Sequence, residues 1–358
     1  MPPVRIRSVD QAISIIPHLL GYQPDEDLLI LIINPGLVCT VRADLDEVRT
    51  PSGFMTVLGP LAARFPGTEF LMVAWSREPR EARGILAIAE ALLGPERIVD
   101  AVSTDGRRWW SIYCQYSECA VEGHEVVLDE EVRAEAVYRG MGVLPDRRAL
   151  AASVAGPTPD ELATDNALLI ETAQWAAALS RQDIADELGR IWDQIEHSED
   201  TEEPLDLRTA LRLAQLSCNE DVALAQWLNT TKEMARPLVG AWVKAISHLP
   251  DEMAATPLVL CGLAAWLAGD GALESCCLER ASGLDPDLVI FQALDLLQRN
   301  AVHPSAWAEI SPDPELISRG ILVPREEFDG LDEPAGRRPR RTRRAAKRSR
   351  AGRRRRRR

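Results

Sequence analysis

Residues 28–33 read Leu-Leu-Ile-Leu-Ile-Ile, an unbroken apolar run of side chains that favour β-strands. Asn-Pro-Gly at 34–36 follows, and a second β-favouring segment covers residues 38–43. Proline and glycine between two such segments indicate a turn, so the stretch predicts a β-hairpin. Because the apolar run has no polar alternation, we expect both strands to be central in a sheet.

The alternation of strand and helix patterns continues through the first half of the chain. Helices are predicted at about 53–64 and 82–93, where apolar residues recur at helical spacing and proline with glycine follows. Further strands are predicted at 69–75, 98–103 and 108–113. Alternation of this kind is typical of an α/β domain with a mixed sheet, here residues 1–150.

The second half has helical periodicity throughout. Gly-Pro-Thr-Pro at 156–159 interrupts the pattern, so we predict a linker at 151–165 and an all-α domain of helical hairpins at 166–320. Residues 258–297 weakly resemble a tetratricopeptide helix pair. Such repeats need about three copies to be stable, so we interpret this one as a local hairpin.

The end of the chain has the opposite charge to the rest. Residues 337–358 hold 15 Lys or Arg and no acid, whereas the preceding residues carry 26 basic against 55 acidic side chains, a formal charge of −29. An arginine run cannot bury apolar surface, so we expect 321–358 to be disordered. The basic residues of this tail are Arg337, Arg338, Arg340, Arg341, Arg343, Arg344, Lys347, Arg348, Arg350, Arg353, Arg354, Arg355, Arg356, Arg357 and Arg358.

Three interpretations of the basic tail are open. It could bind DNA or RNA without reading the sequence, fold back on the acidic part of the chain, or be an extension under weak selection. We favour contact with nucleic acid, because an exposed cationic segment attracts polyanions by counterion release.

Cysteine usage and hydropathy bear on the compartment. The seven cysteines have no repeating interval, which argues for reduced thiols rather than a disulfide framework. We expect no signal peptide, and the longest apolar run, 257–268, is too short to cross a bilayer. These features predict a cytoplasmic protein without a membrane partner.

Carboxylates gather at the ends of the predicted hairpin. Asp25 and Asp27 precede its first strand, and Asp44 and Asp46 follow its second, so the pairs lie close together in an antiparallel hairpin. Such a group could hold Mg²⁺, which prefers oxygen ligands. We favour the simpler interpretation that strand ends emerge into solvent and carry charge. No familiar nucleotide or hydrolase motif occurs, and we predict no cofactor.

Cys114, Cys119 and His124 form a second candidate group, with four residues between successive members. Structural zinc sites usually have a closer cysteine pair and a fourth ligand, so we interpret these residues as half-buried thiols in a loop. A metal site is one alternative. A cysteine nucleophile with His18 or His124 as its base is another.

Arg107, Arg108, Trp109 and Trp110 form a third candidate group, because basic residues beside aromatic rings can bind nucleic-acid bases. Strand alternation places the two tryptophans on opposite faces. Both rings cannot meet one ligand, so we interpret them as structural.

Three segments resemble an actinobacterial family known as a domain of unknown function. They read Pro-His-Leu-Leu-Gly-Tyr-Gln-Pro at 17–24, Arg-Trp-Trp-Ser at 108–111 and Trp-Leu-Ala-Gly-Asp-Gly-Ala at 266–272. The resemblance runs from about residue 8 to 307 and implies an α/β domain plus helices, without an activity. Asp27 stands where the family usually has serine. Glu-Cys-Ala at 118–120 replaces a double cysteine and proline, which weakens a metal or thiol mechanism.

Within the first of these segments, Pro17 is expected to end a helix and Gly21 to let the chain turn. His18 at that turn is either a ligand contact or, as we favour, a packed histidine. His18, Gly21 and Trp109 are therefore the candidate ligand-binding residues.

We infer from the sequence a non-enzymatic binding or adaptor protein whose basic tail contacts nucleic acid nonspecifically. The alternative is a divalent-cation-dependent enzyme acting on a small or phosphorylated substrate in the first domain. A third hypothesis gives the helical half a protein partner.

Overall fold

A computed structural model describes residues 6–34, 37–201 and 205–310 of the 358-residue chain. The predicted disordered segment at 321–358, with all the basic residues of the tail, lies outside the described residues. So do residues 35 and 36 of the predicted hairpin turn.

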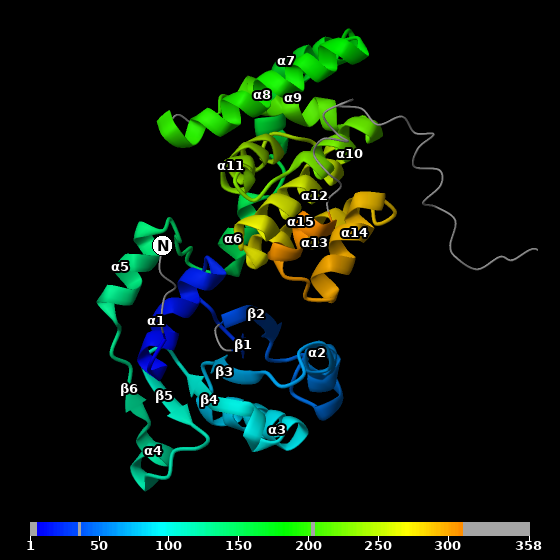
Figure 1. Ribbon diagram of the computed structural model, residues 1–358. Coiled ribbons are helices and arrows are strands. Elements are labelled where there is room, and N and C mark those ends of the chain that lie inside the picture. The colour runs from blue at the N-terminus through cyan, green and yellow to red at the C-terminus, as the bar shows by residue number, and fades with distance from the viewer. Residues whose placement is uncertain (1–5, 35–36, 202–204, 311–358) are drawn as a thin grey trace, which may run out of the picture. The chain divides into compact units, whose positions relative to one another are not determined.

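The first half of the chain forms one six-stranded sheet (Figure 1). Its strands are β1 (Asp27–Ile33), β2 (Leu37–Asp44), β3 (Glu69–Trp75), β4 (Ile98–Thr104), β5 (Arg108–Ser111) and β6 (His124–Glu125). They lie in the order β2-β1-β3-β4-β5-β6, with β3 and β4 parallel and every other neighbouring pair antiparallel. The predicted mixed sheet is confirmed, and β1 and β2 pair as a hairpin.

Helices cover both faces of this sheet. The helices of the first half are α1 (Val9–Leu20), α2 (Pro51–Arg64), α3 (Pro79–Leu93), α4 (Ser117–Glu122) and α5 (Glu130–Tyr138), with a short 3₁₀ turn at Pro95–Arg97. Leu28, Ile30 and Ile32 of β1 pack in one core with α2 and α3. Leu29 and Leu31 point the other way and pack in a core that includes α1. Successive side chains of a strand alternate in this way, so β1 is buried on both faces.

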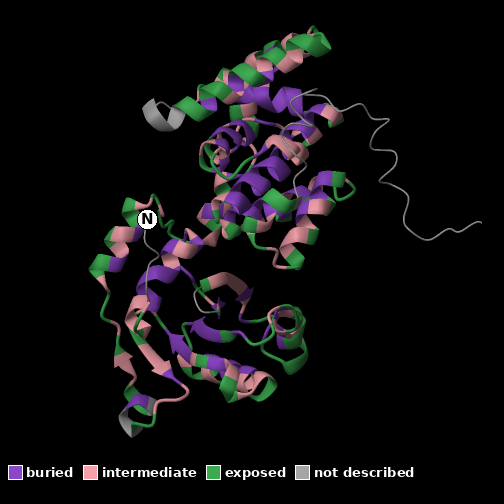
Figure 2. Ribbon diagram, in the orientation of Figure 1, coloured by how far each residue is buried: buried purple, intermediate pink, exposed green. Residues whose placement is uncertain are grey.

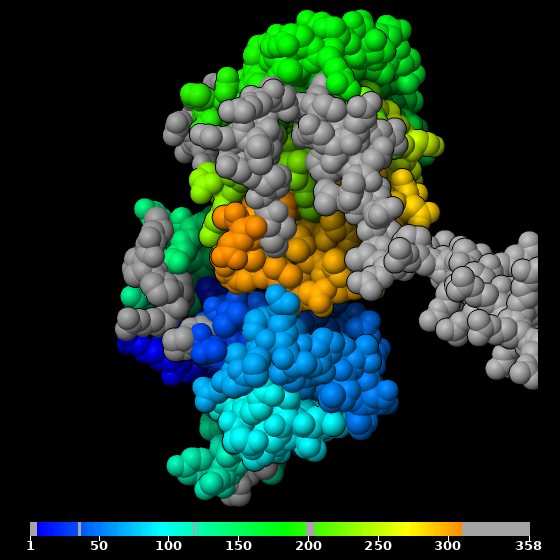
Figure 3. Space-filling model, turned by 45° about the vertical axis from the view of Figure 1, so that its right-hand side comes forward, coloured from blue at the N-terminus to red at the C-terminus, as the bar shows by residue number. Residues whose placement is uncertain are grey.

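Helices α2 and α3, azure and cyan in Figure 3, form the molecular surface on this side of the sheet. Their buried residues include Phe54 and Leu58 of α2 and Leu86 of α3, none of which is exposed to solvent. The sheet therefore has a complete apolar layer on this side.

The opening segment of the chain differs from the expectation at Pro17. This proline lies inside α1, which continues to Leu20 and ends at Gly21 with a left-handed backbone angle φ of 73°. A proline removes one backbone donor without stopping the next turn, whereas an L side chain at positive φ is strained. Gly21 rather than Pro17 therefore ends the helix.

The helical second half is confirmed as well. Its helices are α6 (Arg147–Ser153), α7 (Pro159–Ala177), α8 (Arg181–Thr201), α9 (Leu207–Ser217), α10 (Glu220–Asn229), α11 (Ala235–Ile246), α12 (Asp251–Ala268), α13 (Gly271–Leu284), α14 (Val289–Arg299) and α15 (Trp307–Ile310), with a 3₁₀ turn at Pro304–Ala306. The predicted linker at 151–165 contains the end of α6, a loop and the start of α7. The weakly tetratricopeptide-like segment at 258–297 corresponds to most of α12, all of α13 and most of α14, three helices rather than one pair.

Helix α12 is the centre of the helical core (Figure 2). Every residue from Pro257 to Leu267 is buried, and neighbours on α11, α13 and α14 surround them. Among the described residues it is the one helix long and apolar enough to cross a membrane, but 67% of it is buried inside the protein. That burial is typical of a core helix, which passes the same test of length and composition.

A buried acid lies next to this central helix. Glu274 of α13 is 3% exposed, and its Oε1 atom has no hydrogen-bond partner. Burial, with a smaller contribution from Asp270, raises the pKa of Glu274 to about 8. The carboxyl group is therefore protonated at neutral pH.

We predict that this acid makes the fold less stable as the pH rises. A carboxyl whose pKa is raised in the folded state holds its proton there more strongly than in the unfolded chain. The contribution of Glu274 to the free energy of unfolding is fully present below pH 4.5, its usual pKa. It is lost as the pH rises to about 8, and the free energy of unfolding falls by roughly 4 kcal/mol. Urea unfolding of the full chain across this range measures it.

Glu274→Gln should flatten that pH dependence and make the protein more stable than the wild type at about pH 8, because the amide carries no charge. Glu233→Gln, at an exposed position, is the matched control and should leave the profile unchanged. Equal profiles for the wild type and Glu274→Gln would contradict the prediction.

Candidate functional site

The four candidate aspartates lie at the end of the β1–β2 hairpin, and each has an arginine partner. Asp27 and Asp44 stand opposite each other in the strand register. Arg42, on β2, donates from Nε to Asp27 at 2.7 Å and also pairs with Asp44. Asp27 is 1% exposed, and burial raises its pKa while Arg42 acts in the opposite direction. The buried carboxylate thus depends on Arg42 for its counter-charge.

The other two aspartates pair separately. Asp25 accepts a hydrogen bond from Arg77 Nε at 3.0 Å, and Asp46 accepts one from Arg49 Nε at 2.7 Å. Among the described residues, the groups of three or more possible metal ligands do not include these carboxylates. The Mg²⁺ hypothesis stays a prediction. The carboxylates that it concerns already accept hydrogen bonds from guanidinium groups.

His18, Gly21 and Trp109 do not form one site. His18 lies in the last turn of α1, where its Nδ1 is 2.8 Å from the carbonyl oxygen of Met141. Trp109 donates from its indole nitrogen to Asp10, in the first turn of the same helix, at 3.2 Å. Eight residues of α-helix span about 12 Å, which separates these two contacts.

Cys114, Cys119 and His124 are brought together at the opposite edge of the sheet from the hairpin. One ligand atom from each lies within 4.8 Å of the other two, and Cys114 Sγ is 3.7 Å from His124 Nε2. Cys114 follows β5, Cys119 lies on α4 and His124 begins β6. The connection from β5 to β6, which includes α4, carries the two cysteines, and the first residue of β6 is the histidine.

The surroundings hold the three donors in place. The His124 ring stacks on Trp109 with a centroid distance of 4.3 Å and an interplanar angle of 28°. Arg108 donates to the carbonyl oxygens of Glu122 at 2.5 Å and of Gly123 at 3.1 Å, at the end of α4. A side chain at position 123 would come within 2.5 Å of the Trp110 ring, so only glycine fits there. Arg108 and Trp109 thus have contacts within the fold, while the interpretation of both tryptophans as structural stays a prediction.

The two thiols differ electrostatically. The hydrogen bond to His124 lowers the pKa of Cys114, whereas burial raises the pKa of Cys119. Two thiols and an imidazole at these distances can bind a soft metal ion, form a disulfide or provide a thiolate nucleophile.

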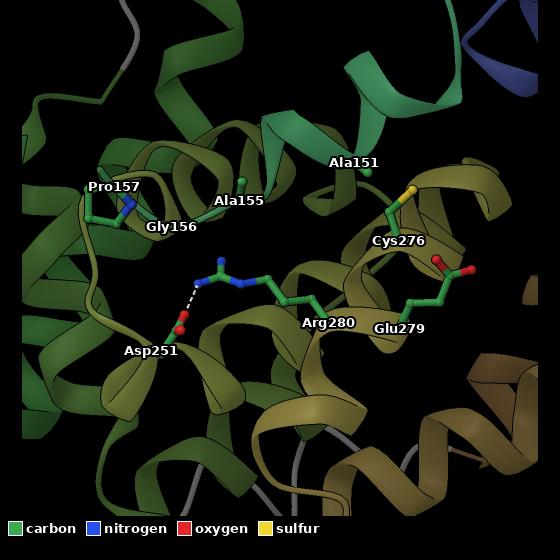
Figure 4. A pocket seen from close by; sticks show the side chains of 8 residues that line it. All are labelled: Ala151, Ala155, Gly156, Pro157, Asp251, Cys276, Glu279 and Arg280. Atoms are coloured by element: carbon green, nitrogen blue, oxygen red, sulfur yellow. Dashed lines mark hydrogen bonds and ion pairs between the residues drawn. The ribbon is translucent and has the colours of Figure 1, made fainter. Parts of the chain in front are cut away.

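A pocket of about 490 Å³ lies in the helical half (Figure 4). It is lined by Ala151, Ala155, Gly156, Pro157, Asp251, Cys276, Glu279 and Arg280. Arg280 donates to Asp251 at 2.7 Å and to the carbonyl oxygen of Val154 at 2.6 Å, and Glu279 pairs with Arg147. Its charged groups therefore join the loop after α6 to α12 and α13.

Residues 10–305 match a family model described as "Domain of unknown function (DUF4192)". The chain belongs to this family. The family resemblance seen in the sequence is thereby confirmed. The description of this family states no activity. Comparisons with curated proteins and with solved structures give no match.

The sequence did not reveal the partners of these groups. Arg42 was not a candidate, although it lies two residues before Asp44, opposite Leu29, and so is a diagonal neighbour of Asp27 in the hairpin. Register alone could have indicated this pair, because a charged side chain on a neighbouring strand often balances a buried charge. The stacking of Trp109 on His124 has no local signal, since it depends on how the loop returns to the sheet.

We predict that Arg42→Gln lowers the free energy of unfolding by about 3–5 kcal/mol, because it leaves the Asp27 carboxylate buried without a counter-charge. Asp27→Asn combined with Arg42→Gln removes both charges and should recover most of that loss. Urea unfolding at neutral pH measures all three proteins.

The matched control is Arg49→Gln, which breaks the exposed pair with Asp46. Those side chains are 48% and 84% exposed, so the loss should be about 0–1 kcal/mol. Similar losses for Arg42→Gln and Arg49→Gln would show that Asp27 does not need its partner.

Proposed function

We propose that this chain is a non-enzymatic binding or adaptor protein of the cytoplasm whose basic tail tethers an acidic folded part to nucleic acid. The observation that carries the proposal is the composition of residues 337–358, with 15 Lys or Arg among 22 residues. Each such charge that meets a phosphate releases a counterion, which favours binding to any DNA or RNA.

The opposite charge of the preceding residues supports this division of roles. A formal charge of −29 repels phosphate, so contact with nucleic acid is concentrated in the tail. The same repulsion keeps the folded part away from the polyanion and accessible to other molecules.

The candidate acids also favour binding over catalysis. A carboxylate that holds a catalytic cation needs free oxygen atoms, whereas Asp25, Asp27, Asp44 and Asp46 all accept hydrogen bonds from arginines. Their arrangement supports the fold of the hairpin rather than a cation-dependent reaction.

A protein partner is proposed for the helical half. Helices α7 and α8 are exposed along much of their length (Figure 2), and Ile170 of α7 is 48% exposed. The exposed faces of these helices are available for contacts with another protein.

We predict that deletion after Gly336 abolishes salt-sensitive binding to DNA and RNA. For the full chain, the logarithm of the binding constant should fall linearly with that of the salt concentration, with a slope no steeper than about −13 on duplex DNA if all 15 charges contact phosphate. Fluorescence anisotropy on two unrelated DNA sequences measures the slope.

Two full-length variants serve as controls. Replacing Arg353–Arg358 by lysine keeps the charge and should keep the slope, whereas replacing them by glutamine should make the slope less steep by about 5. Undiminished binding by the truncated chain, or a strong preference between the two DNA sequences, would refute the nonspecific tether.

A further inference from the structure

We propose that Cys114, Cys119 and His124 form a binding site for Zn²⁺. The site goes beyond the proposed tether, because it lies in the α/β half and involves none of the tail residues. Three features support the site: the distances between the donors, the residues that hold them, and the low burial of the described side chains around them.

The donor distances match those of a tetrahedral ion. Zinc bonds of about 2.3 Å to sulfur and about 2.0–2.1 Å to nitrogen imply an S···N separation of about 3.6 Å and an S···S separation of about 3.8 Å. Cys114 Sγ and His124 Nε2 are 3.7 Å apart. Because all three donors lie within 4.8 Å of one another, a shift of at most about 1 Å brings Cys119 to bonding distance.

The imidazole is oriented for this role before any ion arrives. Stacking on Trp109 sets the plane of the His124 ring, and the ring presents Nε2 toward Cys114. Trp109 is itself anchored by its hydrogen bond to Asp10, so the wall behind the histidine is connected to α1. Ligand residues that are fixed by neighbours in this way bind a metal with less loss of conformational freedom.

Few of the described side chains between β5 and β6 are buried, although Ile112 and Tyr113 pack against the core under α2 and α3. Among the described side chains from 112 to 131, Cys119 is the only buried one, whereas Tyr116 is 77% and Val121 66% exposed. A segment with few buried apolar side chains is typical of the places where a structural metal contributes to folding. The buried side chain of this stretch is therefore the thiol of Cys119 rather than a larger apolar group.

The chemistry of the donors selects the metal. Thiolate and imidazole suit zinc and other soft or borderline transition ions, whereas Mg²⁺ and Ca²⁺ require oxygen ligands. Zinc is usually tetrahedral, and in an open site it takes three protein ligands while water or another donor atom occupies the fourth position. Cys114 and His124 are only half-buried, so that position can exchange with solvent.

The experiment is metal analysis of the full-length protein together with cobalt substitution. We expect zinc to co-purify at about one ion per chain, and Co²⁺ to produce the sulfur-to-metal charge-transfer and intense visible bands of a tetrahedral thiolate site. Cys114→Ser, Cys119→Ser and His124→Asn should each weaken Zn²⁺ binding by more than the roughly 10–100-fold that loss of an outer-shell partner costs. A competition assay with a chromogenic chelator gives the fold-change.

Cys218→Ser is the matched control, because this cysteine is exposed and lies outside the group. It should retain the zinc content and the cobalt spectrum. A protein without bound zinc that gives no charge-transfer band with Co²⁺ would overturn the proposal. So would a Cys218→Ser variant that loses zinc as strongly as Cys119→Ser.

Hydrogen exchange separates a metal site from a pair of thiols. Zinc should slow amide exchange across residues 112–128 in the wild type and have no effect in Cys119→Ser, whose folding is checked by circular dichroism. A Cys114–Cys119 disulfide in protein kept under reducing conditions, detected by mass spectrometry, would contradict the zinc site, because oxidised sulfurs cannot act as thiolate ligands.

Discussion

The burial of β1 on both faces is the constraint on which the other elements depend. Residues 28–32 are at most 1% exposed, and their side chains alternate between a core with α2 and α3 and a core that includes α1. A strand of this kind must have a paired neighbour on each side, because an unpaired backbone in the interior is costly. β2 and β3 fill these positions, both antiparallel to β1.

The same burial explains the charges at the end of the hairpin. β1 begins at Asp27, which the surrounding layers cover almost completely, so its carboxylate needs a cation that the sheet itself supplies. Arg42 reaches it from the opposite strand and also pairs with the more exposed Asp44. The acids that suggest a metal site in the sequence are thus paired with arginines, and the Mg²⁺ hypothesis stays a prediction.

The two edges of the sheet differ in how they are stabilised. At the β2 edge, apolar layers and ion pairs hold the hairpin. At the β6 edge, Cys119 is the one buried side chain among those described in α4 and β6, and two thiols and an imidazole lie together there. This contrast supports the metal site proposed for the second edge.

The sequence by itself determined the type and order of the elements: a mixed sheet, then helices. Apolar periodicity and turn residues act over a few positions, which is why the hairpin, α2 and α3 were predictable. The short elements α4, β6 and α5 were not predicted, and Pro17 lies within a helix because the helix tolerates one missing donor. Only the tertiary structure decided which groups meet. Trp109 bonds to Asp10, 99 positions away in the sequence, and Arg147 bonds to Glu279, 132 positions away. The two thiols and the imidazole between β5 and β6 converge only because the chain returns to the sheet after α4. Such contacts depend on the packing of distant segments, for which local propensity carries no signal.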